Sequence, residues 1–410
     1  MPKRQAAESA VVPIPGAASA TPLPRIFRPQ RALPADAVRP TRAEVNLASL
    51  RHNLRVVERA AGGRPVWAVL KADGYGHGSK AVARTLERAG ASGICVALLE
   101  EGVELREAGI RVPILVTGGY FGRAWGELIR HDLTPVLHDL GQVEAIAAEV
   151  RFSESAPLSV HVKIDTGMSR LGVTPAELPR LVETLARHTE VRVGGLMTHF
   201  SSADSGDLGS IEQQLDRFDE ATQALAAHGI LPSVRHAANS AAVFSCARAA
   251  LDLVRPGIAL FGVEPRPGAE KALRPVMRVR SEIIALRDVP VGVRVGYGGT
   301  WVASRPSRIA TVPIGYADGL VRALSNRGAL LVRGRRAPIA GAVSMDMTMI
   351  DVTDVPGAAL GDECCALGTQ KGPLGEDSIG AAELARELGT IPWEILTNVS
   401  RRVPRFYREP

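Results

Sequence analysis

Short apolar runs alternate with amphipathic stretches along the first part of the chain. Apolar residues at positions 47, 50, 54 and 57 recur at the spacing of a helix. Strand-like runs follow at residues 66–70, 94–98, 114–116, 134–137, 160–164, 193–197, 234–236 and 253–255. Helical stretches separate most of them, at residues 79–89, 100–108, 140–150, 175–188, 211–228 and 240–247, and the connection between 116 and 134 is shorter.

Eight strand–helix alternations within about 200 residues favour a (β/α)8 barrel. A doubly wound open sheet is the alternative, because the number of strands alone does not exclude it. No G-x-G-x-x-G follows the first strand-like run, which counts against a dinucleotide-binding fold.

The alternation of strand-like runs and helical stretches ends at about residue 271. Short strand-like runs separated by Gly and Pro turns occupy residues 276–286, 308–313, 329–332, 337–343, 348–352 and 363–367, and residues 379–388 are helical in pattern. Residues 1–40 are rich in Ala and Pro, and their apolar residues recur at no regular spacing. We therefore expect an α/β protein with a flexible extension over 1–40, a (β/α)8 barrel domain over 41–272 and a mostly β domain over 273–410.

The composition excludes several classes of protein. Hydrophobic residues make up 46% of the 410 residues and charged residues 22%, as in a soluble globular protein. There is no long apolar run, so no membrane association is expected. The net charge of +6 comes from scattered arginines and aromatic residues are only 4%, which disfavours nucleic-acid binding. The cysteines form no C-x-x-C pair, so we expect no metal site, and a cytoplasmic, reducing location.

One lysine stands at the end of a strand-like run. The chain has six lysines, and Lys71 directly follows the apolar residues 66–70. Desolvation there favours a neutral amine, which a Schiff-base lysine requires. Gly74, Gly76 and Gly78 would let the backbone approach a bulky ligand. Taken alone, the same residues also fit a lysine that extends to solvent before a flexible loop.

Other strand-like runs also end in polar or glycine residues. In a barrel, the loops that follow the strands carry the active site. Lys163 and Arg170 belong to the fifth such end, and His199 to the sixth. The loops after the seventh and eighth strands are the usual phosphate site, where the Ser240 hydroxyl and the N–H groups of Gly257 and Ile258 are available.

Two of the five tyrosines lie between or beside glycines in the second domain. Tyr297 stands in Gly-Tyr-Gly-Gly, and Tyr316 follows Gly315. Taken singly, each is typical of a surface turn.

Together these motifs resemble the alanine racemase family of fold-type III pyridoxal phosphate enzymes. The resemblance extends from Arg42 to Phe406. The motifs that carry it, in order and at family-like spacing, are residues 70–78, 163–172, 239–240, 255–258, 296–298 and 315–319.

The resemblance implies a two-base racemisation. Lys71 would form the Schiff base with pyridoxal 5′-phosphate and act as one base, and Tyr297 would act as the second base on the opposite face of the substrate Cα. A single base would tend to return the proton to its original side. In the family this tyrosine comes from the partner subunit, so a homodimer with a shared active site is implied.

The resemblance also assigns cofactor contacts. His199 would lie beside the cofactor ring and connect to Tyr297 through an arginine. Arg255 would bind the pyridine nitrogen, and because arginine stays protonated that nitrogen would remain an unprotonated acceptor. The remaining cofactor-binding residues would be Tyr75, Asn239, Ser240, Gly257 and Ile258, most of them at the phosphate.

The substrate residues follow in the same way. Arg170 and the backbone of Met345 would bind the carboxylate, and Tyr316 would narrow the entrance. Lys163 resembles a lysine that is often carbamylated, which would remove its repulsion with Arg170. Many family members have a tyrosine where this chain has Arg401, which could bind the phosphate bidentately or point away.

The implied function is interconversion of L- and D-alanine, which would supply D-alanine for peptidoglycan. A racemase for serine, for basic amino acids or of broad specificity is the first alternative. A fold-type III decarboxylase or D-amino-acid aldolase is disfavoured by the Gly-Tyr-Gly-Gly motif. A non-catalytic pyridoxal phosphate carrier would resemble the barrel alone.

Overall fold

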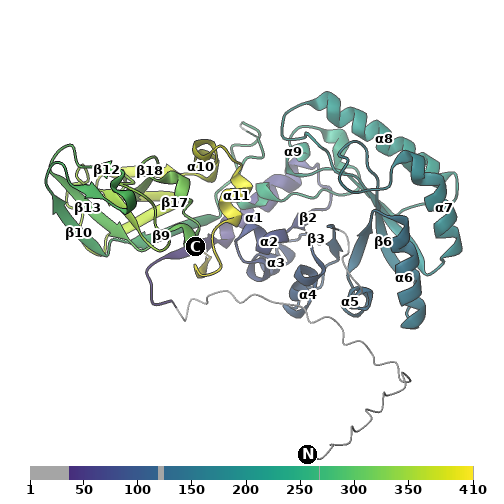
Figure 1. Ribbon diagram of the computed structural model, residues 1–410. Coiled ribbons are helices and arrows are strands. Elements are labelled where there is room, and N and C mark those ends of the chain that lie inside the picture. The colour runs from purple at the N-terminus through teal and green to yellow at the C-terminus, as the bar shows by residue number, and fades with distance from the viewer. Residues whose placement is uncertain (1–36, 119–123, 267, 410) are drawn as a thin grey trace, which may run out of the picture.

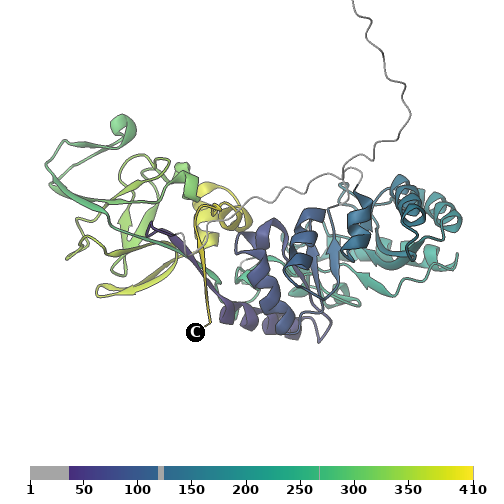
Figure 2. The same cartoon turned by 90° about the horizontal axis from the view of Figure 1, so that it is seen from below.

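The computed structural model describes residues 37–118, 124–266 and 268–409. Most of the extension expected over residues 1–40 lies outside these ranges. The described residues form an α/β unit and a mostly β unit, which lie side by side along the long axis of the molecule (Figures 1 and 2). The C-terminal helices α10 (Ala381–Leu388) and α11 (Pro392–Thr397) lie next to the boundary between the two units.

A parallel sheet forms the centre of the first unit. Its seven strands are hydrogen-bonded in chain order: β2 (Trp67–Val69), β3 (Gly93–Val96), β4 (Ile114–Val116), β5 (Thr134–Leu137), β6 (Leu158–Lys163), β7 (Val191–Met197) and β8 (Val234–His236). The expected eighth strand at 253–255 is reduced to a bridge between Val254 and Val66. Arg255 N donates to Ala238 O at 2.9 Å, and Trp67 N donates to Val254 O at 2.9 Å, so this segment joins the two edges and closes the barrel.

One helix precedes β2, and the others connect the strands or follow β8; their apolar faces pack on the sheet. They are α1 (Leu47–Ala60), α3 (Ser79–Arg88), α4 (Leu99–Glu107), α5 (Trp125–Arg130), α6 (Leu140–Phe152), α7 (Leu178–Arg187), α8 (Leu208–Ala226) and α9 (Ser240–Val243). In α7 the buried positions Leu178, Leu181 and Leu185 recur at helical spacing. The connection expected to be shorter contains α5, whose six residues are too few for a clear periodic signal.

Mostly antiparallel strands form the second unit. The largest sheet has the order β15-β14-β17-β9-β1-β19, with β18 beside β17, and β10-β13-β16 and β11-β12 form smaller sheets. The bounds are β1 (Arg42–Asn46), β9 (Met277–Glu282), β10 (Ala285–Val289), β11 (Arg294–Val295), β12 (Trp301–Val302), β13 (Ser307–Val312), β14 (Ala329–Val332), β15 (Arg335–Pro338), β16 (Thr348–Asp351), β17 (Glu363–Gly372), β18 (Gly375–Ile379) and β19 (Arg405–Arg408).

The strand expected at 337–343 lies earlier in the chain. β15 spans Arg335–Pro338 and pairs with β14 up to the contact of Pro338 with Ala329. Beyond Pro338 only single contacts continue the pairing: Ile339 N donates to Gly328 O at 2.8 Å, and Ala340 N donates to Met349 O at 2.9 Å. Gly341 then adopts a φ of 89°, in the left-handed region. The chain therefore leaves the extended conformation before residue 343.

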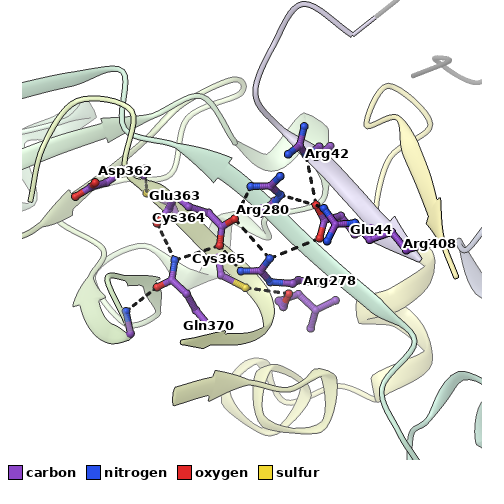
Figure 3. A network of polar contacts seen from close by, with 12 residues as sticks. Arg42, Glu44, Arg278, Arg280, Asp362, Glu363, Cys364, Cys365, Gln370 and Arg408 are labelled. Carbon is purple, nitrogen blue, oxygen red and sulfur yellow. Dashed lines mark hydrogen bonds and ion pairs between the residues drawn. The ribbon is translucent and has the colours of Figure 1, made fainter. Parts of the chain in front are cut away.

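The first strand among the described residues, β1, is part of the second unit. β1 pairs with β9 and, in parallel, with the last strand β19. Glu44 of β1 is buried among arginines: Arg280 Nε and Arg408 Nη2 each donate to its Oε1 at 2.6 Å, and Arg278 pairs with Oε2 at 3.5 Å (Figure 3). Glu363 of β17 accepts from Arg278 and Arg280 in turn. The domain boundaries expected at 41 and 273 remain a prediction, but the hydrogen bonds join residues 42–46 to the sheet of the second unit.

No helix among the described residues is both long enough and apolar enough to cross a membrane.

Candidate active site

A cavity of about 530 Å3 lies at the carboxyl ends of the barrel strands. Its lining comes from the loops that follow β2, β6, β7 and β8, from the segment after Val254, and from the α11 region. The lining residues are Val69, Lys71, Ala72, Tyr75, Met168, Arg170, His199, Phe200, Ser201, Asp204, Asn239, Ser240, Ala241, Arg255, Gly257, Ile258, Pro265, Ile391, Trp393 and Thr397. All eight residues expected to bind the cofactor therefore line one cavity.

The loop that carries Lys71 has an unusual backbone. Residues 72, 73, 74 and 75 all lie in the left-handed region, with φ of 52°, 55°, 60° and 51°. This conformation costs roughly 1–2 kcal/mol for each non-glycine residue, so the surrounding structure has to hold the turn. Glu101 Oε1 accepts the N–H of Ala72 at 2.6 Å, and Asp73 Oδ1 accepts the N–H of Ser79 at 2.7 Å.

The Lys71 side chain is exposed to solvent, and it lines the cavity. Partial burial lowers the pKa of its amine, and the nearby guanidinium of Arg170 lowers it further, whereas the carboxylate of Glu101 raises it. The net direction is downward, so the neutral amine is more accessible than in an ordinary lysine.

One end of the cavity is built to receive an anion. Asn239 caps α9 by accepting the N–H of Ala242 at 3.0 Å, which places Ser240 at the first position of the helix. Gly257 N donates to Ser240 Oγ at 2.8 Å. A Cβ on Gly257 would lie 2.2 Å from the Tyr75 hydroxyl, so only glycine fits beside that ring. Two hydroxyls and backbone N–H groups gathered around this glycine fit a phosphate.

Arg255 provides a buried cation at the cavity. It is 4% exposed. Its Nη1 donates to His236 Nδ1 at 2.5 Å, and its Nη2 donates to Thr198 O at 2.8 Å and to Ala237 O at 3.1 Å. Burial lowers the pKa of Arg255 to about 10, so it stays charged at neutral pH. A guanidinium has five N–H groups, and these three bonds leave donors for a ring nitrogen.

His199 is neutral in this environment. Burial lowers its pKa to about 3, with further contributions from Arg255, Lys163, Arg170 and Lys71. A neutral imidazole beside four cationic side chains adds no charge to the cavity. It fits a neighbour of the cofactor ring.

Lys163 lies near Arg170 but is not one of the lining residues. It is 4% exposed, and burial lowers its pKa to about 8, with Arg170 and Arg255 lowering it further and Asp165 opposing them. The repulsion expected between Lys163 and Arg170 is therefore present. Carbamylation of Lys163 stays a prediction.

Three expected site residues lie away from the cavity of their own chain. Tyr297, Tyr316 and Met345 belong to the second unit, and their exposed fractions are 75%, 41% and 52%. Tyr316 N donates to Ser344 O at 3.0 Å, so the loops of Tyr316 and Met345 meet. None of the three is among the residues that line the cavity. In a single chain, Lys71 and Tyr297 are not brought together.

Comparison with known proteins agrees with this site. The sequence model of the alanine racemase N-terminal domain matches residues 45–265, and that of the alanine racemase C-terminal domain matches residues 276–407. The alanine racemase of Sorangium cellulosum is 61% identical over 379 residues, which cover 91% of this chain and 100% of that protein. The chain belongs to the alanine racemase family.

Solved structures give the same result. The alanine racemase of Streptomyces coelicolor superposes with a TM-score of 0.84 at 37% identity, covering 91% of this chain and 99% of that one. An alanine racemase from Bartonella henselae, solved with covalently bound pyridoxal phosphate, superposes with a TM-score of 0.80 at 29% identity, covering 90% and 99%. This family member is therefore a pyridoxal-phosphate-dependent isomerase with an α/β fold, as the resemblance implied.

The sequence leaves open whether Arg401 binds the phosphate or points away. In this family member Arg401 is exposed and does not line the cavity, whereas Trp393 and Thr397 of the preceding helix do. The sequence interpretation missed Trp393, Thr397 and Glu101. For Glu101 a signal existed, because a glutamate near the start of α4 commonly binds backbone N–H groups. Its carboxylate accepts from Ala97 N at 2.8 Å and from Leu98 N at 3.1 Å.

Proposed function

We propose that this chain interconverts L- and D-alanine with two bases, Lys71 of one subunit and Tyr297 of its partner. One observation carries the proposal. The Lys71 amine, whose pKa is lowered, lines the same cavity as the buried Arg255 and the hydroxyl and N–H groups around Gly257 that fit a phosphate. The family membership supports alanine as the substrate. A racemase for serine, for basic amino acids or of broad specificity is the alternative that a substrate panel would reveal.

The cavity suits pyridoxal phosphate. Lys71 would bind it covalently and Arg255 would donate to the ring nitrogen. His199 and Asn239 would lie around the ring and its substituents, while the phosphate would be held by Tyr75, Ser240, Gly257 and Ile258. When bound, the cofactor withdraws electrons from the Cα–H bond of an amino acid joined to it.

Two side chains of the protein then move the Cα proton of the substrate. Lys71 takes or returns the Cα proton on one face, and Tyr297 does so on the other. Arg170 and the backbone of Met345 hold the carboxylate, and Tyr316 narrows the entrance. Two bases on opposite faces allow net inversion, whereas one base would favour return of the proton to its original face.

We further propose a homodimer with a shared active site. Tyr297, Tyr316 and Met345 are exposed in one chain and do not line its cavity. They would serve the cavity of the partner subunit. A second copy would also cover their apolar side chains, which are exposed in the single chain.

A mixture of two inactive proteins tests the shared site. Lys71→Ala and Tyr297→Phe subunits are unfolded, mixed in equal amounts and refolded. In a shared dimer, each mixed pair has one doubly altered site and one intact site, so about a quarter of wild-type activity should return. If each chain contributed both bases to its own site, no intact site would form and no activity would return.

The racemase activity itself is tested with the cofactor-loaded protein. L-alanine and D-alanine should each be converted to the racemate, with solvent deuterium entering at Cα. Reduction of the loaded protein with borohydride should attach the cofactor to Lys71 alone, and Lys71→Ala should show no chromophore of the bound cofactor. Faster turnover of serine or a basic amino acid than of alanine would assign the alternative specificity, and an adduct on another lysine would remove the basis of the proposal.

We also propose that the enzyme works in the cytoplasm and supplies D-alanine for peptidoglycan. Its four cysteines are all buried and unpaired, which suits a reducing compartment. Cells lacking the enzyme should require external D-alanine for growth. Growth without D-alanine in the absence of a second racemase would contradict this role.

A further inference from the structure

Three aromatic rings form a layer inside the barrel, beneath the cavity. Trp67 comes from β2, His161 from β6 and His236 from β8. The centroids of Trp67 and His161 are 5.7 Å apart with the rings stacked, and those of His161 and His236 are 5.0 Å apart. His161 is 5% exposed and His236 is fully buried.

Glycines on neighbouring strands make room for this layer. A Cβ on Gly195 of β7 would lie 2.7 Å from atoms of the His161 ring. A Cβ on Gly93 of β3 would lie 2.6 Å from the Trp67 ring. The interior of such barrels is usually filled by branched apolar side chains. Here the three aromatic rings take the place of branched apolar side chains, and β3 and β7 carry glycine at the positions next to the rings.

Hydrogen bonds link this layer to Arg255. Arg255 Nη1 contacts His236 Nδ1 at 2.5 Å, and His236 Nε2 contacts His161 Nδ1 at 2.8 Å. A guanidinium can only donate, so His236 Nδ1 is the acceptor and carries no proton. A neutral His236 then has its proton on Nε2, and this N–H donates to His161 Nδ1. His161 must accept there, so its own proton lies on Nε2.

We propose that His161 is a positioning residue, which accepts from His236 and thereby fixes the tautomer that lets His236 accept from Arg255. The chain of donors runs in one direction, from Arg255 to His236 to His161. Together with Thr198 O and Ala237 O, it holds the guanidinium at three points. The orientation of the remaining N–H groups toward the cavity then depends on a residue that does not line it.

The charges around the layer are consistent with two neutral rings. Burial lowers the pKa of His161 to about 4, and Arg255 lowers it further. Burial, Arg255 and His161 hold the pKa of His236 well below its ordinary value. Cys95, the other titratable group that acts on Arg255, is buried, and burial raises its thiol pKa to about 12, so it is uncharged. Protonation of either imidazole would also turn its accepting nitrogen into a donor and break the chain.

Nitrogen-15 NMR of histidine-labelled protein tests the tautomers directly. In the cofactor-free and the loaded protein, His161 and His236 should each carry one proton, on Nε2, from about pH 6 to about pH 8. Single substitutions of each residue assign the signals. A proton on Nδ1 of His236, or a doubly protonated His161 in this range, would overturn the proposal.

Matched variants test the positioning role. His161→Asn can present its side-chain oxygen near the position of Nδ1, whereas His161→Phe keeps a ring of similar size and offers no acceptor. Trp67→Phe alters packing in the same layer without touching the hydrogen bonds. In His161→Phe, the Nε2–H of His236 has no acceptor and only Arg255 still favours this tautomer. A fraction of His236 should therefore carry its proton on Nδ1, and kcat should fall about tenfold with KM for alanine nearly unchanged.

His161→Asn and Trp67→Phe should keep kcat within about threefold of wild type and keep the His236 proton on Nε2. Equal losses of kcat in the Phe and Asn variants, or an unchanged kcat in His161→Phe, would reject the positioning role. The measurement of kcat and KM rests on the proposed function, because it assumes that Arg255 faces the cofactor. The NMR arm on cofactor-free protein does not, so a failure of the racemase assignment and a failure of this proposal can be distinguished.

Discussion

The hydroxyl of Tyr75 occupies the space that a side chain at position 257 would need. A Cβ on Gly257 would lie 2.2 Å from the Tyr75 oxygen and 2.9 Å from its ring carbon. Tyr75 is buried against Phe261, with ring centroids 5.0 Å apart, so it cannot move away freely. The substitution Gly257→Ala should therefore displace the hydroxyl and weaken cofactor binding about tenfold or more, measured by equilibrium titration of the cofactor-free protein.

A double substitution serves as the control for this prediction. Tyr75→Phe removes the clashing oxygen, so Gly257→Ala should weaken binding less in that background than in wild type. Additive losses would show that the two residues act independently and that the close approach has no part in cofactor binding.

The carboxylate of Glu101 should tune the amine of Lys71. It raises the Lys71 pKa and accepts the N–H of the next residue, Ala72. Glu101→Gln removes the charge, so the Lys71 pKa should fall. In cofactor-free protein, the rate at which Lys71 reacts with an amine-selective acylating reagent should then rise at a lower pH than in wild type, as followed by peptide mass spectrometry.

The matched control is Glu100→Gln, because Glu100 is exposed on the same helix. Its pH profile should coincide with that of wild type. An unshifted profile in Glu101→Gln, or an equal shift in both variants, would contradict the electrostatic role of Glu101.

Lys163 should respond to carbon dioxide. With a pKa of about 8, a tenth or so of its amines are neutral at pH 7, far more than in an ordinary lysine. A carbamate at this position would be an anion beside Arg170. Removal of dissolved carbon dioxide should lower activity severalfold and bicarbonate should restore it, while carbon-13 NMR with labelled bicarbonate should show a carbamate signal.

Lys163→Gln should abolish both the carbamate signal and the bicarbonate effect, and Lys80→Gln, at an exposed lysine, should leave both unchanged. A bicarbonate-independent enzyme without a carbamate signal would show that Lys163 remains an amine.

Arg405 should stabilise the lysine loop from the far end of the chain. It is 1% exposed, and its guanidinium donates to Gly76 O at 2.8 and 3.0 Å, as well as to the carbonyls of Val399, Ser400 and Val403. Arg405→Gln would leave several buried carbonyls without a donor, so the free energy of unfolding should fall by about 3 kcal/mol or more. Urea unfolding measures this loss, and the exposed Arg64→Gln should change stability by less than about 0.5 kcal/mol.

The parts of the fold that repeat with a strong period could be predicted from the sequence. The barrel strands and the longer helices lie within a few residues of the expected ranges, because their burial produces a periodic apolar pattern. The membership of β1 in the second unit could not be predicted. It depends on pairing with β9 and β19, which lie far away in the sequence, and local patterns carry no information on such partners.

The candidate site also contains residues that could be predicted from the sequence and residues that could not. Lys71 and Ser240 follow strands, and Arg255 follows the bridge at Val254, so the barrel topology itself predicts that they meet. Trp393 and Thr397 reach the site through the packing of the C-terminal segment, and no motif marks them. Glu101 reaches the site through the packing of α4, and its place near the start of that helix was the one available signal. The hydrogen-bonded histidines were not expected either, since His161 and His236 are 75 positions apart and meet only inside the closed barrel.

The pairing of β1 with β19 has a consequence for biosynthesis. On the ribosome, the barrel segment emerges well before β19, and Arg405 is not available to bind Gly76 O until β19 has also emerged. A nascent chain can therefore assemble its barrel strands early, but its lysine loop lacks its final support until β19 has been made. A premature stop codon in place of Arg405 should accordingly yield a protein with most of its secondary structure and little capacity to retain its vitamin.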